Sequence, residues 1–191
     1  MIPRQLIIAV AVLLVAVTAL GFYVGRMRRR AGEVQPAASD VRPAPPAAGP
    51  TEKVTLYVAD DSVGTLRRQG AEIPLPSGRQ QRAEELLRAL LRVYQQPDSP
   101  HPIASAADVR SIYLMSGAAV IDLNEAFADQ HRSGILDEQL TVDSLVETLA
   151  ANVSGVSRVR ILVEGKTRET LAGHVDLTEF FDVSAVAQSG L

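Results

Sequence analysis

The chain has 191 residues, of which 47% are hydrophobic, 4% aromatic and 21% charged, which suits a folded domain with an aliphatic core and additional segments. Six of its 19 basic residues and two of its 22 acidic residues precede Thr51, so residues 51–191 carry a net charge of −7, and an acidic domain of this kind disfavours nucleic-acid binding. The absence of cysteine excludes disulfides, thiolate metal sites, a cysteine nucleophile and acylation of a lipoprotein cysteine.

Residues 6–24 form an apolar run that only Thr18, Gly21 and Tyr23 interrupt. A helix of roughly 20 apolar residues covers a hydrocarbon core of about 30 Å, so we predict a single membrane-spanning helix within an anchor region, residues 1–30. A cleaved signal peptide with a small-residue site at Val17-Thr18-Ala19 is the alternative. The run continues past that site and ends at a basic cluster, which favours the anchor.

Residues 31–51 are rich in alanine and proline and contain few large apolar side chains. Proline cannot donate a backbone hydrogen bond, so this segment cannot join a sheet. We predict a disordered or partly polyproline-like linker that separates the membrane anchor from a folded domain.

Residues 52–182 are predicted to form that folded domain, and residues 183–191 a flexible tail. Alternating apolar residues indicate strands, and apolar residues at helical spacing indicate two helices. The predicted order is β-β-α-β-β-α-β-β, an α+β fold in which two helices pack on one mixed β-sheet. The elements are, in chain order, strands near 54–58 and 65–75, a helix over 79–95, a hairpin of 109–114 with 119–123, a helical turn from 124 to 127, a helix over 141–153, and a hairpin of 159–163 with a strand that starts at Thr167.

Capping residues define the expected ends of these helices. Ser77 is predicted to cap the first helix, Asn124 the short turn and Thr141 the second long helix. Gly155 is well placed to end the second helix, and Gly165 to form the turn of the last hairpin.

Two segments of the chain repeat one pattern, aliphatic-Asp-Leu-(Asn/Thr)-Glu-x-Phe, at 121–127 and at 175–181. We interpret each copy as the closing strand of a hairpin followed by a capped turn. In that interpretation Asp122 and Asp176 bond backbone amides of the turns, which is the usual role of Asp in such positions.

These motifs, in this order, resemble the GerMN domain family of sporulation, spore-germination and other bacterial envelope proteins. The resemblance covers about residues 52–178. It implies an extracytoplasmic domain held by a membrane anchor or lipid, with a role in envelope, cortex or spore-coat assembly and no known catalytic residues. The residues that carry it are Leu123, Asn124, Glu125 and Phe127, then Thr148 and Leu149, then Val156, Val159, Ile161, Leu162, Val163, Gly165 and Lys166, and finally Gly173, His174, Val175 and Asp176.

The orientation of the predicted anchor is ambiguous. The basic cluster at residues 26–30 follows the apolar run, so the positive-inside rule places the domain in the cytoplasm. The family resemblance and the long linker favour an extracytoplasmic domain at the cell membrane, and this is the localisation we expect. The predicted partners are the membrane, through the N-terminal helix, and a component of the cell envelope.

The sequence contains no recognisable catalytic centre. The three histidines lack metal-ligand spacing, so we predict neither a metal site nor a cofactor. His174 and Asp176 project to the same face of a strand and form an orienting pair or pin a strand end. The candidate ligand-binding residues are Asp122, Asn124, His174 and Asp176.

We therefore expect a non-enzymatic binding or scaffolding module of the cell envelope. One alternative is a hydrolase that acts on wall glycan or peptide with paired carboxylates such as Asp122 and Glu125. A second alternative is an assembly domain that forms homo-oligomers through a sheet edge or a helix face.

Overall fold

A computed structural model describes residues 49–189 of the chain. The predicted anchor at 1–30 and most of the predicted linker at 31–51 lie outside the described residues. Residues 49–189 contain no helix that is both long and apolar enough to cross a membrane. The elements are β1 (Thr51–Asp60), β2 (Thr65–Pro74), α2 (Arg79–Tyr94), β3 (Val109–Met115), β4 (Gly117–Leu123), α3 (Glu125–Asp129), α4 (Ile135–Asn152), β5 (Val156–Val163), β6 (Phe181–Asp182) and α5 (Val183–Ser189).

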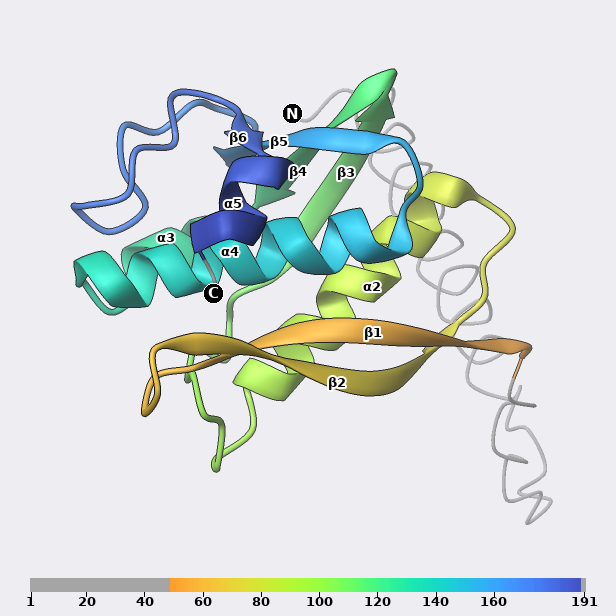
Figure 1. The fold of residues 1–191 in the computed structure, drawn as a ribbon, viewed down its shortest axis with the longest axis horizontal. Helices are drawn as coiled ribbons and strands as arrows, with labels where there is room; N and C mark the ends of the chain where they lie inside the picture. Colours follow the sequence, from red (N-terminus) through yellow and green to blue (C-terminus); the bar gives the residue numbers. More distant parts are fainter. Residues whose placement is uncertain (1–48, 190–191) are drawn as a thin grey trace, which may run out of the picture. The chain divides into compact units, whose positions relative to one another are not determined.

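The strands form two sheets with the two long helices between them (Figure 1). β1 and β2 make a two-stranded antiparallel ribbon whose ten residue pairs run from Thr51↔Pro74 to Asp60↔Thr65 without a bulge. The second sheet has the order β3-β4-β5-β6, in which only the β4–β5 pair is parallel. The α+β class and the mixed character of the larger sheet agree with the prediction from sequence.

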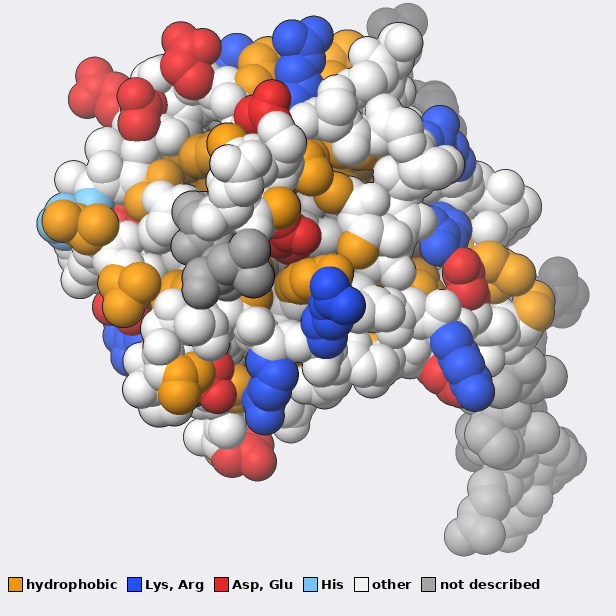
Figure 2. Space-filling model, viewed as in Figure 1, with side chains coloured by type: hydrophobic (Ala, Val, Ile, Leu, Met, Phe, Trp, Pro, Cys, Tyr) orange, Lys and Arg blue, Asp and Glu red, His pale blue; other side chains and the backbone are white. Residues whose placement is uncertain are grey.

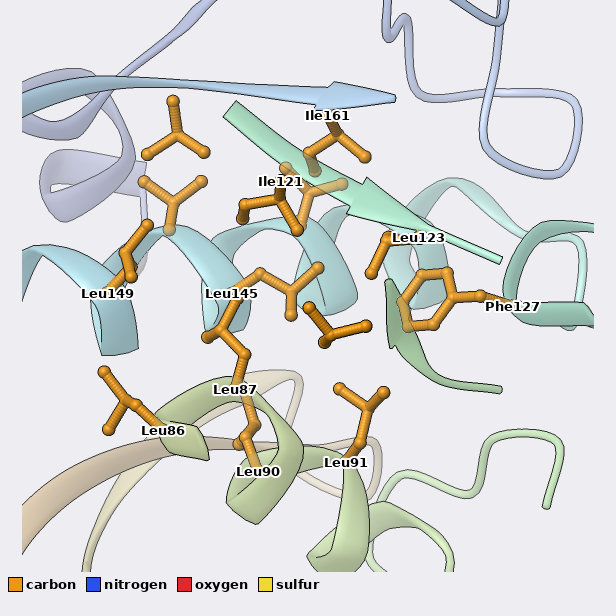
Figure 3. Packing of buried hydrophobic residues seen from close by; sticks show 14 of the residues in the cluster. Leu86, Leu87, Leu90, Leu91, Ile121, Leu123, Phe127, Leu145, Leu149 and Ile161 are labelled. Atoms are coloured by element: carbon orange, nitrogen blue, oxygen red, sulfur yellow. The ribbon is translucent and has the colours of Figure 1, made fainter. Parts of the chain in front are cut away.

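The hydrophobic core lies where α2 and α4 meet the larger sheet (Figure 3). The α2 leucines approach from one side, Leu145 and Leu149 of α4 lie in the middle, and Ile121 and Ile161 of the sheet lie on the other side. These side chains are at most 2% exposed. Aliphatic side chains supply nearly all of this core, as the low aromatic content indicated.

The prediction of one sheet was wrong, because helix α4 closes the ribbon on the side of β1. Three α4 side chains, at a spacing of four residues, hydrogen-bond to the backbone of β1. Asn152 Oδ1 accepts from Thr55 N at 3.2 Å and its Nδ2 donates to Thr55 O at 2.7 Å. Thr148 Oγ1 accepts from Tyr57 N at 2.9 Å, and Ser144 Oγ donates to Tyr57 O at 2.7 Å.

The α2 helix completes this seal at the end of the strand, where Tyr94 Oη accepts from Ala59 N at 2.8 Å. With these bonds β1 has a hydrogen-bonded neighbour on both sides, one of them helical. Strand β1 therefore does not need a place in the larger sheet, because its buried amides and carbonyls are already satisfied.

The last predicted hairpin is also only partly present. Glu164 (φ 52°) and Gly165 (φ 71°) form the expected tight turn, which closes with a bridge between Val163 and Lys166. Residues 167–180 then leave the sheet as a loop, and the strand that pairs with β5 is β6 (Phe181–Asp182).

The helix ends differ from prediction at several places. α4 begins at Ile135 after an N-cap at Gly134, so Thr141 lies inside the helix rather than at its start. α2 begins after Gly78, and no side chain caps it, so the predicted cap at Ser77 was wrong. The predicted flexible tail contains the helix α5, where Asp182 Oδ1 accepts from Ser184 N at 2.8 Å. The predicted cap of α3 is confirmed, since Asn124 accepts from Phe127 N at 3.2 Å.

Candidate functional site

Asp122 and Asn124, two of the predicted binding residues, hold the end of β4 in place. Asp122 is 6% exposed, and its Oδ1 accepts from Gly165 N at 2.7 Å, which ties β4 to the turn after β5. Asn124 Oδ1 also accepts from Asp108 N at 3.0 Å, while its Nδ2 donates to Ala106 O at 2.7 Å. Each of these polar side chains is engaged with backbone groups, although Asp122 bonds to a turn forty-three residues away rather than to the turn that follows it.

His174 and Asp176, the other two predicted residues, lie in the loop after β5. Asp176 Oδ1 accepts from Thr178 N and Thr178 Oγ1, both at 2.7 Å, which is the turn role predicted for this aspartate. His174 pairs with Glu138 of α4, its Nδ1 lying 2.9 Å from Glu138 Oε1. No hydrogen bond or ion pair within residues 49–189 joins His174 to Asp176, or joins either of them to Asp122 or Asn124.

Glu138 is the residue of this region that sequence reasoning missed. It is fully buried, and its Oε2 accepts from three backbone amides of the loop, Ala172 N and His174 N at 3.0 Å and Val175 N at 2.9 Å. Burial on its own would raise the pKa of Glu138, but these amides and the His174 ring outweigh burial and lower it to about 2. A single ionised carboxylate thus fastens the loop to α4.

The carboxylates of the alternative hydrolase mechanism do not form an exposed pair. Asp122 is buried against Gly165, and Glu125 lies at the start of α3, where its backbone N donates to Glu164 Oε1 at 3.0 Å. Arg110 Nη1 lies 2.5 Å from Glu164 Oε2 and 3.7 Å from Asp122 Oδ2, so it compensates the charge there. Asp122 is therefore held by a backbone amide and lies near a cation, so it is not free to act with Glu125 as the acid–base pair that the alternative requires.

A second polar cluster surrounds Thr141, which is in the interior of α4. His101 Nε2 and His131 Nε2 are both within hydrogen-bonding distance of Thr141 Oγ1, at 2.6 and 2.7 Å. The Thr141 hydroxyl donates to Asp137 O at 3.0 Å. His101 Nδ1 lies 2.5 Å from Asp61 Oδ1. Burial, the largest influence, lowers the pKa of His131.

Ligand atoms of Asp61, His101 and Asp137 lie within 4.8 Å of one another, a spacing that suits a metal ion. The guanidinium of Arg132 contacts both carboxylates, however, lying 2.9 Å from Asp137 Oδ1 and also binding Asp61 Oδ2. Arg132 therefore takes the place of a cation between the two acids, and we interpret the cluster as an ion-pair network that joins the β1–β2 turn to α4.

The outer edge of β2 differs from these satisfied clusters. Backbone groups of β1 at Thr55, Tyr57 and Ala59 face the helices, so those of the alternate residues Val54, Leu56 and Val58 face β2. Their β2 partners in the register are Ala71, Gln69 and Arg67. The alternate β2 residues must then direct their N–H and C=O groups away from the ribbon; they are Leu66, Arg68, Gly70, Glu72 and Pro74.

Nothing within residues 49–189 covers this edge with a hydrogen bond, so four amides and five carbonyls of one strand face outward. Pro74, the last of the set, lacks an N–H, which is the reason that proline is tolerated at an edge of this kind. The open edge of β2, residues Leu66 to Pro74, is therefore the site at which the fold offers a regular row of unsatisfied hydrogen-bonding groups.

A shallow cavity of about 360 Å³ lies across the middle of the ribbon, lined by Lys53, Val54, Gly70, Ala71 and Glu72. A Cβ atom at Gly70 would meet nothing within 4 Å, so the backbone is accessible there. The Arg68 guanidinium lies 5.4 Å from the centre of the Tyr57 ring, on the outer face of the ribbon. Figure 2 shows basic side chains spaced along the ribbon, with acidic side chains close by.

The sequence contained one signal for the open edge and one for the sealed edge. The signal for the open edge is a strand with glycine at its centre and proline at its end. The signal for the sealed edge is a series of polar residues on one face of a helix, Ser144, Thr148 and Asn152. Neither is specific without knowledge of which strand neighbours which helix.

Solved structures share this fold. One is a protein of Clostridium perfringens assigned as a lipoprotein, with a TM-score of 0.51 and 19% identity over 76% of this chain and 95% of that one. Another holds the tandem GerMN domains of the sporulation protein GerM from Bacillus subtilis, with a TM-score of 0.52 and 19% identity. That match covers 70% of this chain and 46% of the tandem, so the chain spans about half of the two-domain protein.

A comparison with curated protein sequences gives no match. The sequence model of the Germane family, described by the words "sporulation and spore germination", matches residues 55–169. That range runs from β1 to the loop after β5 and includes both long helices, the sealed edge of β1 and the open edge of β2. The resemblance to GerMN domains drawn from the sequence is thereby confirmed, and the chain belongs to the Germane family.

Proposed function

We propose that this protein is a membrane-anchored scaffolding module of the bacterial cell envelope, whose domain lies outside the cytoplasm and binds an envelope protein without catalysing a reaction. The observation that carries the proposal is the open edge of β2. Edge strands of this kind accept an extended segment of another chain by strand addition, where main-chain hydrogen bonds provide affinity and side chains provide specificity.

The charge pattern of the edge supports a specific partner rather than indiscriminate aggregation. Arg68 and Glu72 flank Gly70 on the outer face, and charged side chains at an edge oppose contact with uncharged, apolar strands. The expected partner is therefore an extended segment with an acidic residue and a basic residue four positions apart, matched in reverse order to Arg68 and Glu72.

The extracytoplasmic location rests on other grounds. The apolar run at residues 6–24 is long enough to cross a membrane, and the structural relative from Clostridium perfringens is assigned as a lipoprotein. A reporter enzyme that is active only outside the cytoplasm, fused after Leu191, tests the location. Activity of the fusion is expected, and a fusion that is active only when transferred to the N-terminus would contradict the proposal.

Photo-crosslinking tests the binding edge. A photoreactive residue at Gln69, an exposed β2 position that carries neither of the pairing charges, is expected to capture an envelope protein in the full chain in its native membrane, identified by mass spectrometry. Gly70→Pro should abolish the capture, because proline removes an outward N–H that the β1–β2 pairing does not use. Tyr113→Ser, at an exposed site on the other sheet, is the matched control and should leave capture unchanged.

A further inference from the structure

We infer that the strand received by β2 is the β2 of a second copy of this chain, paired antiparallel about a two-fold axis through Gly70. The inference rests on the proposed scaffolding function and names the partner of the same edge. Two ribbons joined in this way would form one four-stranded antiparallel sheet across two copies.

Side-chain charges select this register. With Gly70 on the axis, Arg68 lies directly opposite the partner's Glu72, and Glu72 lies opposite the partner's Arg68. All four side chains project from the outer face of the combined sheet, because residues two apart along a strand share a face. The pairing thus creates two cross-strand ion pairs related by symmetry.

Neighbouring registers lose both ion pairs. If the axis moves by one residue, Arg68 faces either the partner's Gly70 or the partner's Pro74. If it moves by two, either Arg68 faces the partner's Arg68 or Glu72 faces the partner's Glu72, and like charges directly opposite each other are unfavourable. The register about Gly70 is therefore the one that the charges of this strand favour.

The backbone agrees with that register. Gly70 belongs to the set whose N–H and C=O face outward, so the two central glycines exchange both hydrogen bonds across the axis. A glycine inside a strand weakens it and often marks a place where another backbone approaches closely. A Cβ atom at Gly70 would meet nothing within 4 Å, so no described side chain crowds this position.

Charge reversal tests the inference. The full chain in detergent micelles, followed by sedimentation velocity over a concentration series, is expected to show a monomer–dimer equilibrium. Arg68→Glu and Glu72→Arg should each raise the dimer dissociation constant about tenfold, since each replaces two attractive pairs with two repulsive ones. The double variant Arg68→Glu/Glu72→Arg restores both pairs and should return the constant to within about twofold of the original.

Arg67→Glu is the matched control, because it makes the same change of charge at the next residue, which faces the partner's Ile73 in this register. Its effect should be smaller than that of Arg68→Glu. A double variant that stays as dissociated as the single variants would overturn the inference.

Disulfide trapping locates the axis independently, because the chain has no cysteine of its own. Gly70→Cys should crosslink to its counterpart under mild oxidation, since paired residues in a sheet have Cα atoms about 5.5 Å apart, within the range of a disulfide. Glu72→Cys should not crosslink, because its two copies would lie roughly 13 Å apart along the strands.

The outcomes separate this inference from the function on which it rests. A full chain that stays monomeric at every concentration, while Gly70→Cys crosslinks to a different envelope protein, overturns the self-pairing and leaves the scaffolding function intact. A chain that stays monomeric and captures no protein through the photoreactive residue at Gln69 overturns both.

Discussion

The two edges of the β1–β2 ribbon are built in opposite ways. On the β1 side, α4 and α2 place Asn152, Thr148, Ser144 and Tyr94 against the strand, and backbone groups at three consecutive alternate positions are satisfied. On the β2 side the described chain supplies no hydrogen-bonding partner. Helix α4 therefore supplies the hydrogen bonds that a neighbouring strand would supply, but only along the β1 edge.

The difference shows how a buried sheet edge can be completed by side chains rather than by another strand. Glu138 extends the same use of α4, since its carboxylate satisfies three amides of the loop after β5. Elsewhere, Arg88 Nη2 and Glu84 Oε1 of α2 bond to Val109 O and Ile112 N on the edge of β3. Within residues 49–189, β2 is thus a long strand edge that no side chain or strand completes, and this contrast is the basis of the proposed binding site.

The largest effect is expected at Glu138. Glu138→Gln removes the charge that three amides and His174 surround, and should lower the free energy of unfolding by about 3 kcal/mol at pH 7. Urea denaturation of the full chain in detergent measures it. Glu72→Gln is the matched control, because it is the same substitution on the open edge. Equal losses in the two variants would contradict the role of Glu138 as an acid that binds backbone amides.

The pH dependence of stability gives a further test of Glu138. The folded-state pKa is lowered from 4.5 to about 2, so the carboxylate stabilises the fold above pH 4.5 and loses that effect as the pH falls towards 2. The original chain should therefore lose more stability between pH 4.5 and pH 2 than the Glu138→Gln variant does. Parallel curves for the two chains would show that the charge of Glu138 is not responsible.

A smaller loss is expected where α4 seals β1. Asn152→Ala leaves both the N–H and the C=O of Thr55 without their partner and should cost about 2 kcal/mol. Hydrogen exchange at the Thr55 amide should accelerate in the same variant, which locates the effect at the edge rather than in the helix. Unchanged exchange at Thr55 would mean that another group takes over the role of Asn152.

An opposite, stabilising effect is expected at Asp143, an α4 acid whose hydrogen-bond partner is Gln139 rather than a backbone amide. Burial, partly opposed by Gln139, raises the pKa of Asp143 to about 6. Its ionised form therefore destabilises the fold, and stability is lost as the pH rises from 3.8 to about 6. Asp143→Asn should stabilise the protein by about 1 kcal/mol at pH 8, and the difference should vanish below pH 4.

The smallest effect is expected on the open edge itself. Glu72→Gln and Gln69→Ala should change the unfolding free energy by less than about 0.5 kcal/mol, measured at concentrations that keep the chain monomeric. Both side chains are exposed, and neither supports a buried backbone group. A large loss in either variant would show that the edge is part of the folded core.

Patterns of neighbouring residues in the sequence predicted the elements that depend on contacts between residues close together in the chain. The leucine spacing of α2, the hairpin of β3 and β4 and the cap at Asn124 were all visible in the sequence. The start of α4 was missed because residues 129–133 are polar and Gly134 follows them, although Asp137 and Glu138 are favourable in the first turn of a helix.

Contacts between distant residues account for the rest. A strand was predicted to start at Thr167, but residues 167–180 form a loop, and Glu138, more than thirty positions earlier, binds three of its amides. The role of Thr148 and Asn152 is invisible without the position of β1, which lies more than ninety residues away along the chain. Of the predicted binding residues, Asp122 lies in β4, Asn124 caps α3, and His174 and Asp176 lie in the loop after β5 rather than on a strand. The open edge was not identified, because its distinguishing property is that no neighbour lies along it within residues 49–189.

The register of the ribbon also determines how the domain would bear a mechanical load. Strand β1 opens the described fold at Thr51, so a pull transmitted through the preceding residues enters along the axis of that strand. Ten residue pairs on one side and the α4 side chains on the other would then be sheared together rather than peeled apart in turn. Tension applied at Thr51 would therefore act against both sides of β1 at once.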